Sequence, residues 1–345
     1  MSGFRTIGEQ ERERFDAFAE KANGHPCQSF AWGEADRIRG WQPVRAMFEE
    51  DGRIVATLVA LRKPLARFCL MDAMFGPVAD FSDDETARRV TRALGEFARR
   101  QRALYLRINP EAELRGSLAR ILFEEGFRPA RSEWRYSCTI AVSLSEPLES
   151  IHARMEKRAR EAIRRAQRLG IEVSAVQDGP DIEAFLEIYQ DTCRRKGLPA
   201  ASARYLRSLC ENNHLNRLFL ARCNGAPAAA SVCYTFGRRI VGAFGASAHP
   251  CPPGAGTYVE WQVMRWGKEH RFIEYDLGGI PCNPRPADDQ WGVYFFKRSL
   301  GGRTVQLVGE YERCVVPALT GVFGRLIGAR SRLKRRLSRV RVGDE

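Results

Sequence analysis

The order of predicted secondary-structure elements in the first half of the chain is repeated in the second half. Each half has two alternating apolar strands joined by a glycine turn, then a third strand, a helix and a further strand. In the first half these elements are predicted at Val44–Glu49, Ile54–Arg62, Phe68–Phe75, a helix capped by Ser82, and Ala103–Ile108, with a closing helix at Leu114–Glu124. In the second half they are predicted at Leu218–Arg222, Ala228–Phe236, Ile240–Ala246, Tyr258–His270, and Phe272–Leu277, which stops at Gly278. The repeat therefore predicts an α/β fold with mixed sheets, made of two copies of one unit.

The length of the chain agrees with two such units. At ~150 residues per domain, 345 residues correspond to about two domains. We expect a first domain at residues 1–145, a second at 146–316, and a basic helix at 317–345 that packs back on the first domain. Acetyltransferase-like (GNAT) domains have the same order of elements, so the chain resembles two tandem GNAT-like acyltransferase domains.

The net charge indicates an anionic partner. The chain has 55 Lys+Arg against 42 Asp+Glu, a formal charge of +13, and only seven of the basic residues are lysines. A surplus of this size attracts anions. Nucleic acid, a phosphorylated small molecule and an anionic membrane surface all remain open from the charge alone.

Two segments concentrate this charge. Ile151–Gly170 carries seven basic residues against two acidic ones beside a narrow apolar stripe, which is typical of a helix that ends at Gly170. It is either a domain-opening helix with a solvated face or a helix that faces a polyanion. Arg325–Glu345 has eight basic and two acidic residues and resembles a basic amphipathic helix. That helix packs on the first domain, contacts nucleic-acid phosphates or contacts an anionic leaflet.

Several functional classes find no support in the sequence. Residues Met1–Phe15 contain no apolar signal core, so we expect a cytoplasmic protein, and the uncharged run Ile240–Val259 contains four Gly and three Pro, which favours a buried hairpin and loop over a membrane helix. The ten Cys form no CxxC pair and the five His no HExxH, which predicts reduced core thiols with neither disulfides nor zinc. P-loop, GxGxxG and GxSxG motifs are absent from the sequence as well, so we expect no metal and no bound cofactor.

A glycine-containing loop keeps an acyl-CoA donor open. Cys251–Gly256 precedes a predicted helix, and backbone N–H groups at such a position can bind a pyrophosphate. Cys251 stands where acyl-CoA transferases usually have Gln or Arg. The same residues are also compatible with a simple connecting loop.

An ordered set of short motifs resembles the FemABX aminoacyltransferases over most of the chain. The set begins at Gln28–Gly33 with Gly40-Trp41 and continues through the basic helix Arg160–Gly170. The later motifs are Gly245-Ala246-Ser247, Glu260-Trp261, Tyr275–Gly279, Phe296-Lys297 and Gly309-Glu310-Tyr311. The resemblance implies two GNAT-like domains and the transfer of an amino acid from aminoacyl-tRNA to an amine, commonly on a peptidoglycan precursor.

The resemblance also implies the roles of particular residues. Lys297, beside Phe296, is expected to stabilise the oxyanion formed when an amine attacks the aminoacyl ester, a contribution of ~3 kcal/mol per donor. The expected substrate-binding residues are Trp32, Arg37, Arg204, Tyr205, Tyr258 and Glu310. The expected tRNA-binding residues are Arg160, Arg164, Arg165, Arg335 and Arg336. The expected partners are aminoacyl-tRNA as co-substrate, an amine-bearing acceptor that is a peptidoglycan precursor or a related amine, and peripherally an anionic membrane, with the enzyme a monomer.

The chain departs from the family pattern at three positions. Asp36 stands where the family usually has a substrate-binding Lys, Ala201 where it has an Arg, and Asn109 where it often has Asp before Pro. Because two cations that would face phosphates are replaced, we predict that UDP-MurNAc-pentapeptide is not the acceptor in the usual way.

Two other functions are compatible with the same residues. One is an acyl-CoA-dependent N-acyltransferase, served by the loop Cys251–Gly256. The other is a non-catalytic RNA- or membrane-binding protein, served by the two basic segments. Measuring the affinity for charged tRNA and for acetyl-CoA at increasing salt concentrations distinguishes these functions.

Overall fold

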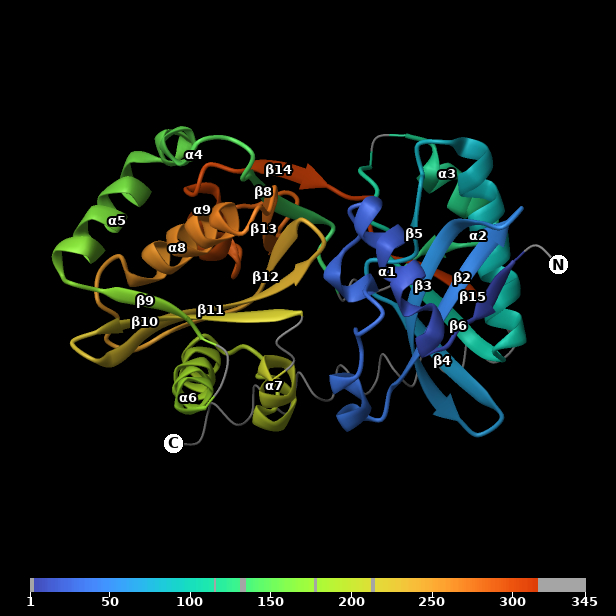
Figure 1. Ribbon diagram of the computed structural model, residues 1–345, viewed down its shortest axis with the longest axis horizontal. Helices are drawn as coiled ribbons and strands as arrows, with labels where there is room; N and C mark the ends of the chain where they lie inside the picture. The colour runs from blue at the N-terminus through green and yellow to red at the C-terminus, as the bar shows by residue number, and fades with distance from the viewer. Residues whose placement is uncertain (1–2, 115, 131–134, 177–178, 212–214, 316–345) are drawn as a thin grey trace.

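A computed structural model describes residues 3–114, 116–130, 135–176, 179–211 and 215–315, and Figure 1 shows them as two lobes side by side. Each lobe is built on one mixed sheet with helices packed against it. This confirms the predicted α/β class with two repeated units. The predicted tail helix Arg325–Glu345, with Arg335 and Arg336, lies outside the described residues.

The first lobe contains an eight-stranded sheet in the order β1-β2-β3-β4-β6-β15-β7, with β5 paired to β3. Its strands are β1 Phe4–Thr6, β2 Gln42–Glu50, β3 Arg53–Leu65, β4 Phe68–Ala73, β5 Val78–Ala79, β6 Ala103–Ile108, β7 Arg128–Pro129 and β15 Tyr311–Cys314. Its α-helices are α1 Arg12–Lys21, α2 Asp84–Arg100 and α3 Leu118–Glu124. The helical stripe Ala87, Val90, Leu94 and Phe97 of α2 is buried in the core of this lobe, as its spacing predicts.

The second lobe contains a seven-stranded sheet in the order β14-β8-β13-β12-β11-β10-β9. Its strands are β8 Cys138–Ser143, β9 Glu172–Val176, β10 Asn216–Cys223, β11 Ala226–Phe236, β12 Arg239–Ser247, β13 Glu274–Ile280 and β14 Arg303–Gln306. Its α-helices are α4 Leu148–Arg154, α5 Lys157–Arg168, α6 Pro180–Arg195, α7 Ala203–Cys210, α8 Ala255–Glu269 and α9 Trp291–Arg298. Figure 1 shows α6 and α7 on one face of this sheet and α5 and α8 on the other.

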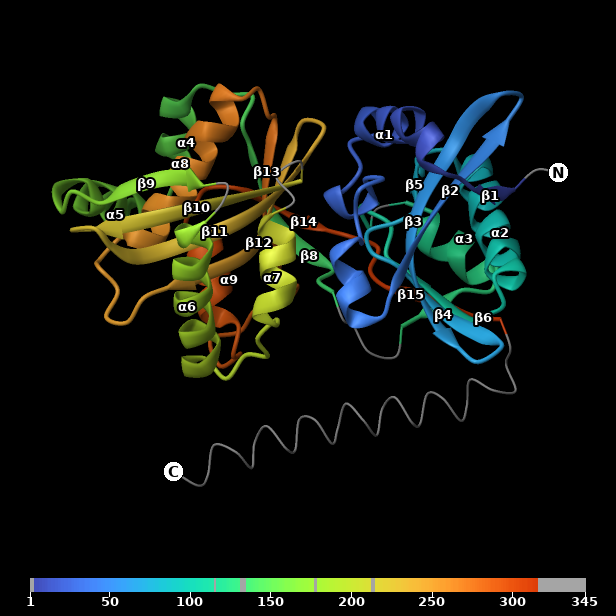
Figure 2. The ribbon, with the colours of Figure 1, turned by 60° about the horizontal axis from the view of Figure 1, so that its bottom comes forward.

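Two strands cross the domain boundaries that the sequence predicts. β8 lies before residue 145 but pairs with β13 in the second sheet, and β15 lies before residue 316 but pairs with β6 in the first. Figure 2 shows β15 in the lower part of the first lobe, the lobe that contains β6. The boundaries 145 and 316 are therefore wrong for these strands, because their hydrogen-bonding partners are more than 100 residues away in the chain.

Local details of four predicted elements differ. Asp83 caps α2 in place of Ser82, since its Oδ2 accepts from the Thr86 N–H at 2.8 Å. The predicted basic helix Ile151–Gly170 is two helices, α4 and α5, because Met155 is extended and the Glu156 N–H donates to Ser299 O (2.9 Å). The closing helix begins at Leu118 where Leu114 was predicted, and β13 continues through Gly278 to Ile280.

The prediction of reduced thiols is wrong for one pair of cysteines. Cys138 and Cys282 form a disulfide with their Cα atoms 5.2 Å apart. Cys138 begins β8 opposite Ile280, and Cys282 follows Ile280 by two residues, so strand pairing brings the two together. Their separation of 144 residues contains no spacing signal.

An apolar cluster joins the two lobes. Trp32 of the first lobe meets Tyr234 of β11 edge to face, with ring centroids 5.0 Å apart. Beside the cluster, Arg239 of β12 pairs with Glu111 of the first lobe at 2.5 Å and with Asp276 of β13 at 2.9 Å. Buried contacts of both kinds therefore hold the lobes together. Within the described residues, every helix is too short or too polar to cross a bilayer.

Candidate active site

The second sheet opens between its two parallel strands. β12 and β13 pair at only three positions, Arg239 with Glu274, Ile240 with Tyr275 and Val241 with Asp276, although both strands run further. Past these pairs the register of β13 against its other neighbour, β8, shifts between Asp276 and Gly279, and Gly278 adopts a φ of +80°. A Cβ at Gly278 would lie 2.7 Å from Gly242 O, so only glycine fits where the strands part.

A buried carboxylate shapes this opening. Asp276 Oδ1 accepts hydrogen bonds from the Gly278 N–H at 2.7 Å and from the Thr139 hydroxyl, while Oδ2 accepts from Arg239. Asp276 is fully buried, and a buried carboxylate is stable only with such partners. The turn at Gly278 is therefore built into the sheet before any ligand arrives.

Lys297 places its ammonium group at the opening. It lies in α9, and its Nζ donates to Gly279 O at 2.9 Å. Burial lowers the pKa of Lys297 to about 8, while Asp276 and Glu260 act in the opposite direction. A lysine with this pKa is still largely protonated at neutral pH and can stabilise a developing negative charge.

Two cavities meet at Lys297. Cavity 1, about 900 Å³, lies between the lobes, and cavity 2, about 560 Å³, lies in the second lobe beside α8. Lys297, Gly242 and Ala243 line both cavities. One group in cavity 1 and another in cavity 2 can therefore both reach the ammonium group.

Apart from Lys297, the charged groups of cavity 1 among the described residues are paired with one another or with neighbours. Arg135 pairs with Asp72 at 2.5 Å and with Glu310 at 3.0 Å, and Glu310 also lies 3.6 Å from Arg107. Burial, with Arg239 and Arg135 nearby, lowers the pKa of His25 well below its usual value, so this ring is neutral. Glu310, expected to bind substrate, does line cavity 1.

Cavity 2 is lined largely by small residues and by one carboxylate. Glu260 of α8 accepts a hydrogen bond from the Tyr275 hydroxyl, and both side chains line the cavity with Lys297. Burial raises the pKa of Glu260, and the neighbouring Tyr275 and Lys297 oppose this rise. Glu260 belongs to the motif Glu260-Trp261, for which the family resemblance implied no residue role, and it follows the longest uncharged run of the chain.

The loop before α8 lines cavity 2 and packs on α5. Gly254 adopts a φ of +87°, and a Cβ there would overlap the carbonyl oxygen of Ala162 in α5. Gly256, two residues later, has open space around its Cα. Gly254 therefore allows α5 to approach the mouth of cavity 2 closely.

Five residues expected to bind substrate line neither cavity. Trp32 and Tyr205 are buried, at 5% and 6% exposure, Trp32 against Tyr234 and Tyr205 beneath Arg39. Tyr258 packs on the core of the second lobe. Arg37 pairs with Glu34 on the surface, and Arg204 is exposed on α7. The structure therefore places these five side chains at the lobe interface, on the core of the second lobe or on the surface, and their role in binding substrate stays a prediction. Phe296, by contrast, lines cavity 2 beside Lys297.

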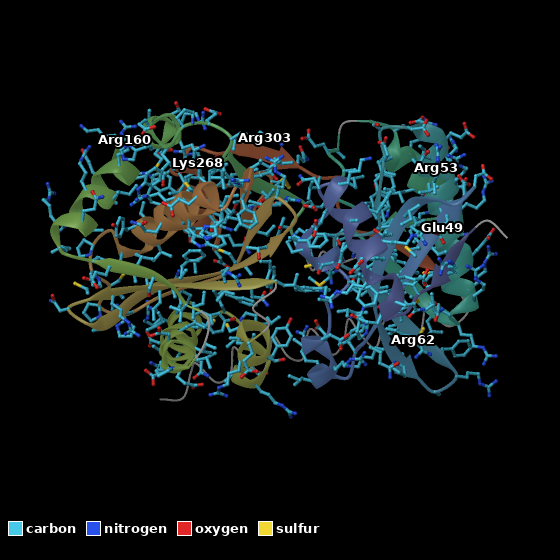
Figure 3. All side chains as sticks on the ribbon, viewed as in Figure 1. Glu49, Arg53, Arg62, Arg160, Lys268 and Arg303 are labelled. Carbon is cyan, nitrogen blue, oxygen red and sulfur yellow. A yellow bond between two sulfur atoms is a disulfide. The ribbon has the colours of Figure 1, made fainter. Side chains whose placement is uncertain are left out.

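The predicted tRNA-binding arginines of α5 divide into two kinds. Arg160 donates to the carbonyl oxygens of Ala153 (3.1 Å) and Met155, and so joins α5 to α4 (Figure 3). Arg164 and Arg165 are exposed. Arg160 therefore has a structural role in joining the two helices, whereas the side chains of Arg164 and Arg165 face solvent.

The departures from the family pattern have structural roles. Asp36 is buried at 1% exposure and pairs with Arg39. Asn109 Oδ1 accepts a hydrogen bond from the Phe75 N–H at 2.7 Å, beside cavity 1. The Ala201 N–H donates to the Tyr189 hydroxyl at 3.2 Å. None of these three side chains presents a cation to cavity 1.

Comparison with known proteins agrees with this architecture. The FemAB family model matches residues 10–121, and the acetyltransferase (GNAT) domain model matches residues 153–298. Lipid II:glycine glycyltransferase of Staphylococcus haemolyticus (strain JCSC1435) is 20% identical over 411 aligned residues, which cover 94% of this chain and 97% of that protein.

Solved structures show the same fold. The crystal structure of FemX superposes with a TM-score of 0.81 at 17% identity, over 92% of this chain and 99% of that one. A tandem GNAT protein from the clavulanic acid biosynthesis pathway superposes with a TM-score of 0.56 at 12% identity, over 92% of this chain and 99% of that one. The two lobes are therefore tandem GNAT-like units.

Proposed function

We propose that this chain, which matches the FemAB and GNAT models in its two halves, is an aminoacyltransferase of the FemABX family that moves an amino acid from aminoacyl-tRNA to an amine of a lipid-linked peptidoglycan precursor. The observation that carries the proposal is the position of Lys297, whose ammonium group lines both cavities. A two-substrate transfer needs such a point, where donor and acceptor meet beside a cation.

The arrangement suits attack of an amine on an ester. The acceptor amine enters through cavity 1, and the aminoacyl ester lies in cavity 2 with its carbonyl carbon beside Lys297. The new C–N bond forms as the ester C–O bond breaks, and the ribose oxygen of the tRNA takes up the proton that the amine loses and leaves as a hydroxyl group. Negative charge on the carbonyl oxygen in the transition state is stabilised by the Lys297 ammonium group.

The electrostatics of cavity 1 favour a lipid-linked acceptor over a nucleotide-linked one. A pyrophosphate bound inside the cavity would need unpaired cations. Among the described lining residues, Arg135 is already bound to two carboxylates and His25 is neutral, which leaves Lys297 as the one cation without a carboxylate partner, and a pyrophosphate would need more than that one. The peptide stem of lipid II can enter cavity 1 while its pyrophosphate and lipid stay outside at the membrane, and the relative from Staphylococcus haemolyticus is named for that acceptor.

The donor side carries basic charge in the required place. α5 touches the loop that lines cavity 2, and its residues Arg164 and Arg165 are exposed. Phosphates of a tRNA acceptor arm would lie along this helix when the 3′ end enters cavity 2. We propose that the enzyme acts as a monomer in the cytoplasm, at the inner face of the membrane where lipid II is reached.

A transfer assay with the full chain tests the proposal. Labelled aminoacyl-tRNAs are offered with lipid II, with UDP-MurNAc-pentapeptide, or with neither, and acetyl-CoA replaces the tRNA in a further arm. We expect amide formation with lipid II and no submillimolar binding of UDP-MurNAc-pentapeptide. Acetyl transfer from acetyl-CoA without any transfer from tRNA would replace this proposal by the acyl-CoA alternative.

A further inference from the structure

Glu260 lines cavity 2 but has no role in the formation of the amide bond, for which Lys297 supplies the charge. The described residues that line this cavity include Lys196 and Lys297 as cations and Glu260 as their one carboxylate. Much of the remaining wall consists of glycine, alanine and serine, including Ala230, Gly245 and Ala246. A carboxylate in such a wall is stable only with hydrogen-bond donors or a cation around it.

The position of Glu260 is held by the sheet beneath it. The Tyr275 hydroxyl donates to Glu260 Oε2, and the same hydroxyl lies 3.6 Å from Cys233 Sγ on β11. Tyr275 is fully buried in β13, next to Asp276. The carboxylate is therefore aimed from α8 towards the opening where Lys297 lies.

An aminoacyl ester carries its α-amino group on the carbon next to the reacting carbonyl. When the carbonyl oxygen lies at Lys297, the α-amino group reaches the same end of cavity 2. An acetyl or other simple acyl group has no cation at this position. Lys297 offers a cation to the carbonyl oxygen, and Glu260 offers an anion beside it. This arrangement fits an aminoacyl group, which has both an oxygen and an ammonium group, and does not fit a simple acyl group.

We propose, resting on the aminoacyltransferase function above, that Glu260 binds the α-ammonium group of the aminoacyl donor and so selects aminoacyl esters over acyl groups that lack the amine. Burial raises the pKa of Glu260, while Tyr275, Lys297 and Ser231 oppose the rise, and an ammonium group bound beside the carboxylate would oppose it further.

The contact also assigns the two amines of the reaction to different roles. An α-amino group bound to a carboxylate stays in its ammonium form, which has no lone pair for attack. Only the amine that enters through cavity 1 then acts as the nucleophile. Glu260 would therefore prevent one donor from being aminoacylated by another at this site.

Matched donors with and without the amine test the proposal. Glycyl-tRNA and alanyl-tRNA are compared with glycolyl-tRNA and lactyl-tRNA, which nitrous acid produces from the same preparations by replacing the α-amino group with hydroxyl. Transfer to lipid II is measured for wild type, Glu260→Gln, Glu260→Asp and the control Glu269→Gln, which changes an exposed residue of the same helix.

We expect wild type and Glu269→Gln to prefer the aminoacyl donor by roughly 10–100-fold, the range of a hydrogen bond between charged groups. Glu260→Gln should bring the ratio of the two rates to within about threefold of unity, and Glu260→Asp should restore part of the preference. The ratio isolates this contact, because any change in Lys297 affects both donors alike.

The outcomes separate this inference from the proposed function. Wild-type transfer from both donors at equal rates, or a Glu260→Gln variant that keeps the full preference, would overturn the role of Glu260 alone. If Glu260→Gln does not fold, as its melting temperature would show, the wild-type ratio and Glu260→Asp decide. Transfer from none of the four donors would overturn the proposed function and this inference with it.

Discussion

Lys297 Nζ lies 2.9 Å from the carbonyl oxygen of Gly279 and donates a hydrogen bond to it, at the point where β12 and β13 part. The bond uses one of the three N–H donors of the ammonium group. The bond also joins α9 to the C-terminal end of β13, which gives the cation a defined position between the two cavities.

Replacing Lys297 by Met should abolish most of the transfer and leave the fold intact. Loss of one oxyanion donor corresponds to a decrease on the order of 10²–10³ in kcat. Single-turnover transfer and the thermal unfolding curve of Lys297→Met measure both parts. Lys268→Met is the control, because Lys268 donates to Leu144 O at 3.1 Å away from both cavities. Near-normal turnover of Lys297→Met would remove this residue from the mechanism.

The rate should fall as pH rises through the pKa of Lys297. Burial lowers that pKa to about 8, so the side chain is charged below pH 8 and becomes neutral above it. Because the neutral amine does not stabilise an oxyanion, kcat/KM should fall about tenfold per pH unit on the alkaline side. In Lys297→Arg the side chain stays charged, so this decline should disappear at a lower maximum rate. An unchanged alkaline limb in that variant would assign the titration to another group.

Arg239→Met should destabilise the protein strongly. The guanidinium pairs with Glu111 of the first lobe and with Glu274 and Asp276 of β13, at 2.5, 3.1 and 2.9 Å. Removing one partner of a buried ion pair leaves the others uncompensated and costs about 3–5 kcal/mol. Urea unfolding measures the loss. Arg207→Met, which breaks an exposed pair with Glu183, should leave the midpoint unchanged.

Gly254→Ala and Gly256→Ala should change stability in opposite directions. A methyl group at Gly254 meets Ala162 O, and the φ of +87° is strained for alanine, which together cost at least ~1 kcal/mol. Gly256 lies within α8 with free space around it, so alanine should stabilise the helix by up to ~1 kcal/mol. The two melting temperatures test this. Equal effects would show that contact between α5 and the loop does not limit stability.

Neutralising Arg164 and Arg165 should lower the salt dependence of tRNA binding. Each phosphate contact contributes a slope of roughly −0.7 to −0.9 in log K against log salt. In Arg164→Gln/Arg165→Gln the slope should become shallower by up to about twice that amount, equally for all charged tRNAs. Arg53→Gln/Arg62→Gln, on the first lobe in Figure 3, is the control. An identical slope in both double variants would exclude α5 from the tRNA contact.

Local patterns of the chain predict its strands and helices well where the neighbours in sequence decide the structure. β6 occupies the predicted range Ala103–Ile108, because an apolar run bounded by turns and Asn109-Pro110 leaves few alternatives. The stripe of α2 is buried as its spacing predicts. The repeat of these elements along the chain also predicts two units of one fold.

Contacts between distant residues lie beyond such patterns. β8 and β15 pair outside their predicted domains, and Cys138 meets Cys282 because two strands adjoin. Trp32 and Tyr205 are residue types that are common in binding sites, but here they pack between the two lobes. An aromatic residue of this kind is suited to a core and to a pocket alike, and only the packing decides between them.

The sequence by itself determined the α/β class, the tandem repeat and the basic balance, and an ordered set of motifs singled out Phe296-Lys297 as the candidate catalytic residues. The tertiary structure decided which charged groups share the reaction space. Glu260 and Lys297 are 37 residues apart on different helices, yet both line cavity 2, because the parting of β12 and β13 opens the sheet between them. The strength of an electrostatic interaction depends on the distance between the charges and on their burial, and the spacing of residues along the chain predicts neither quantity.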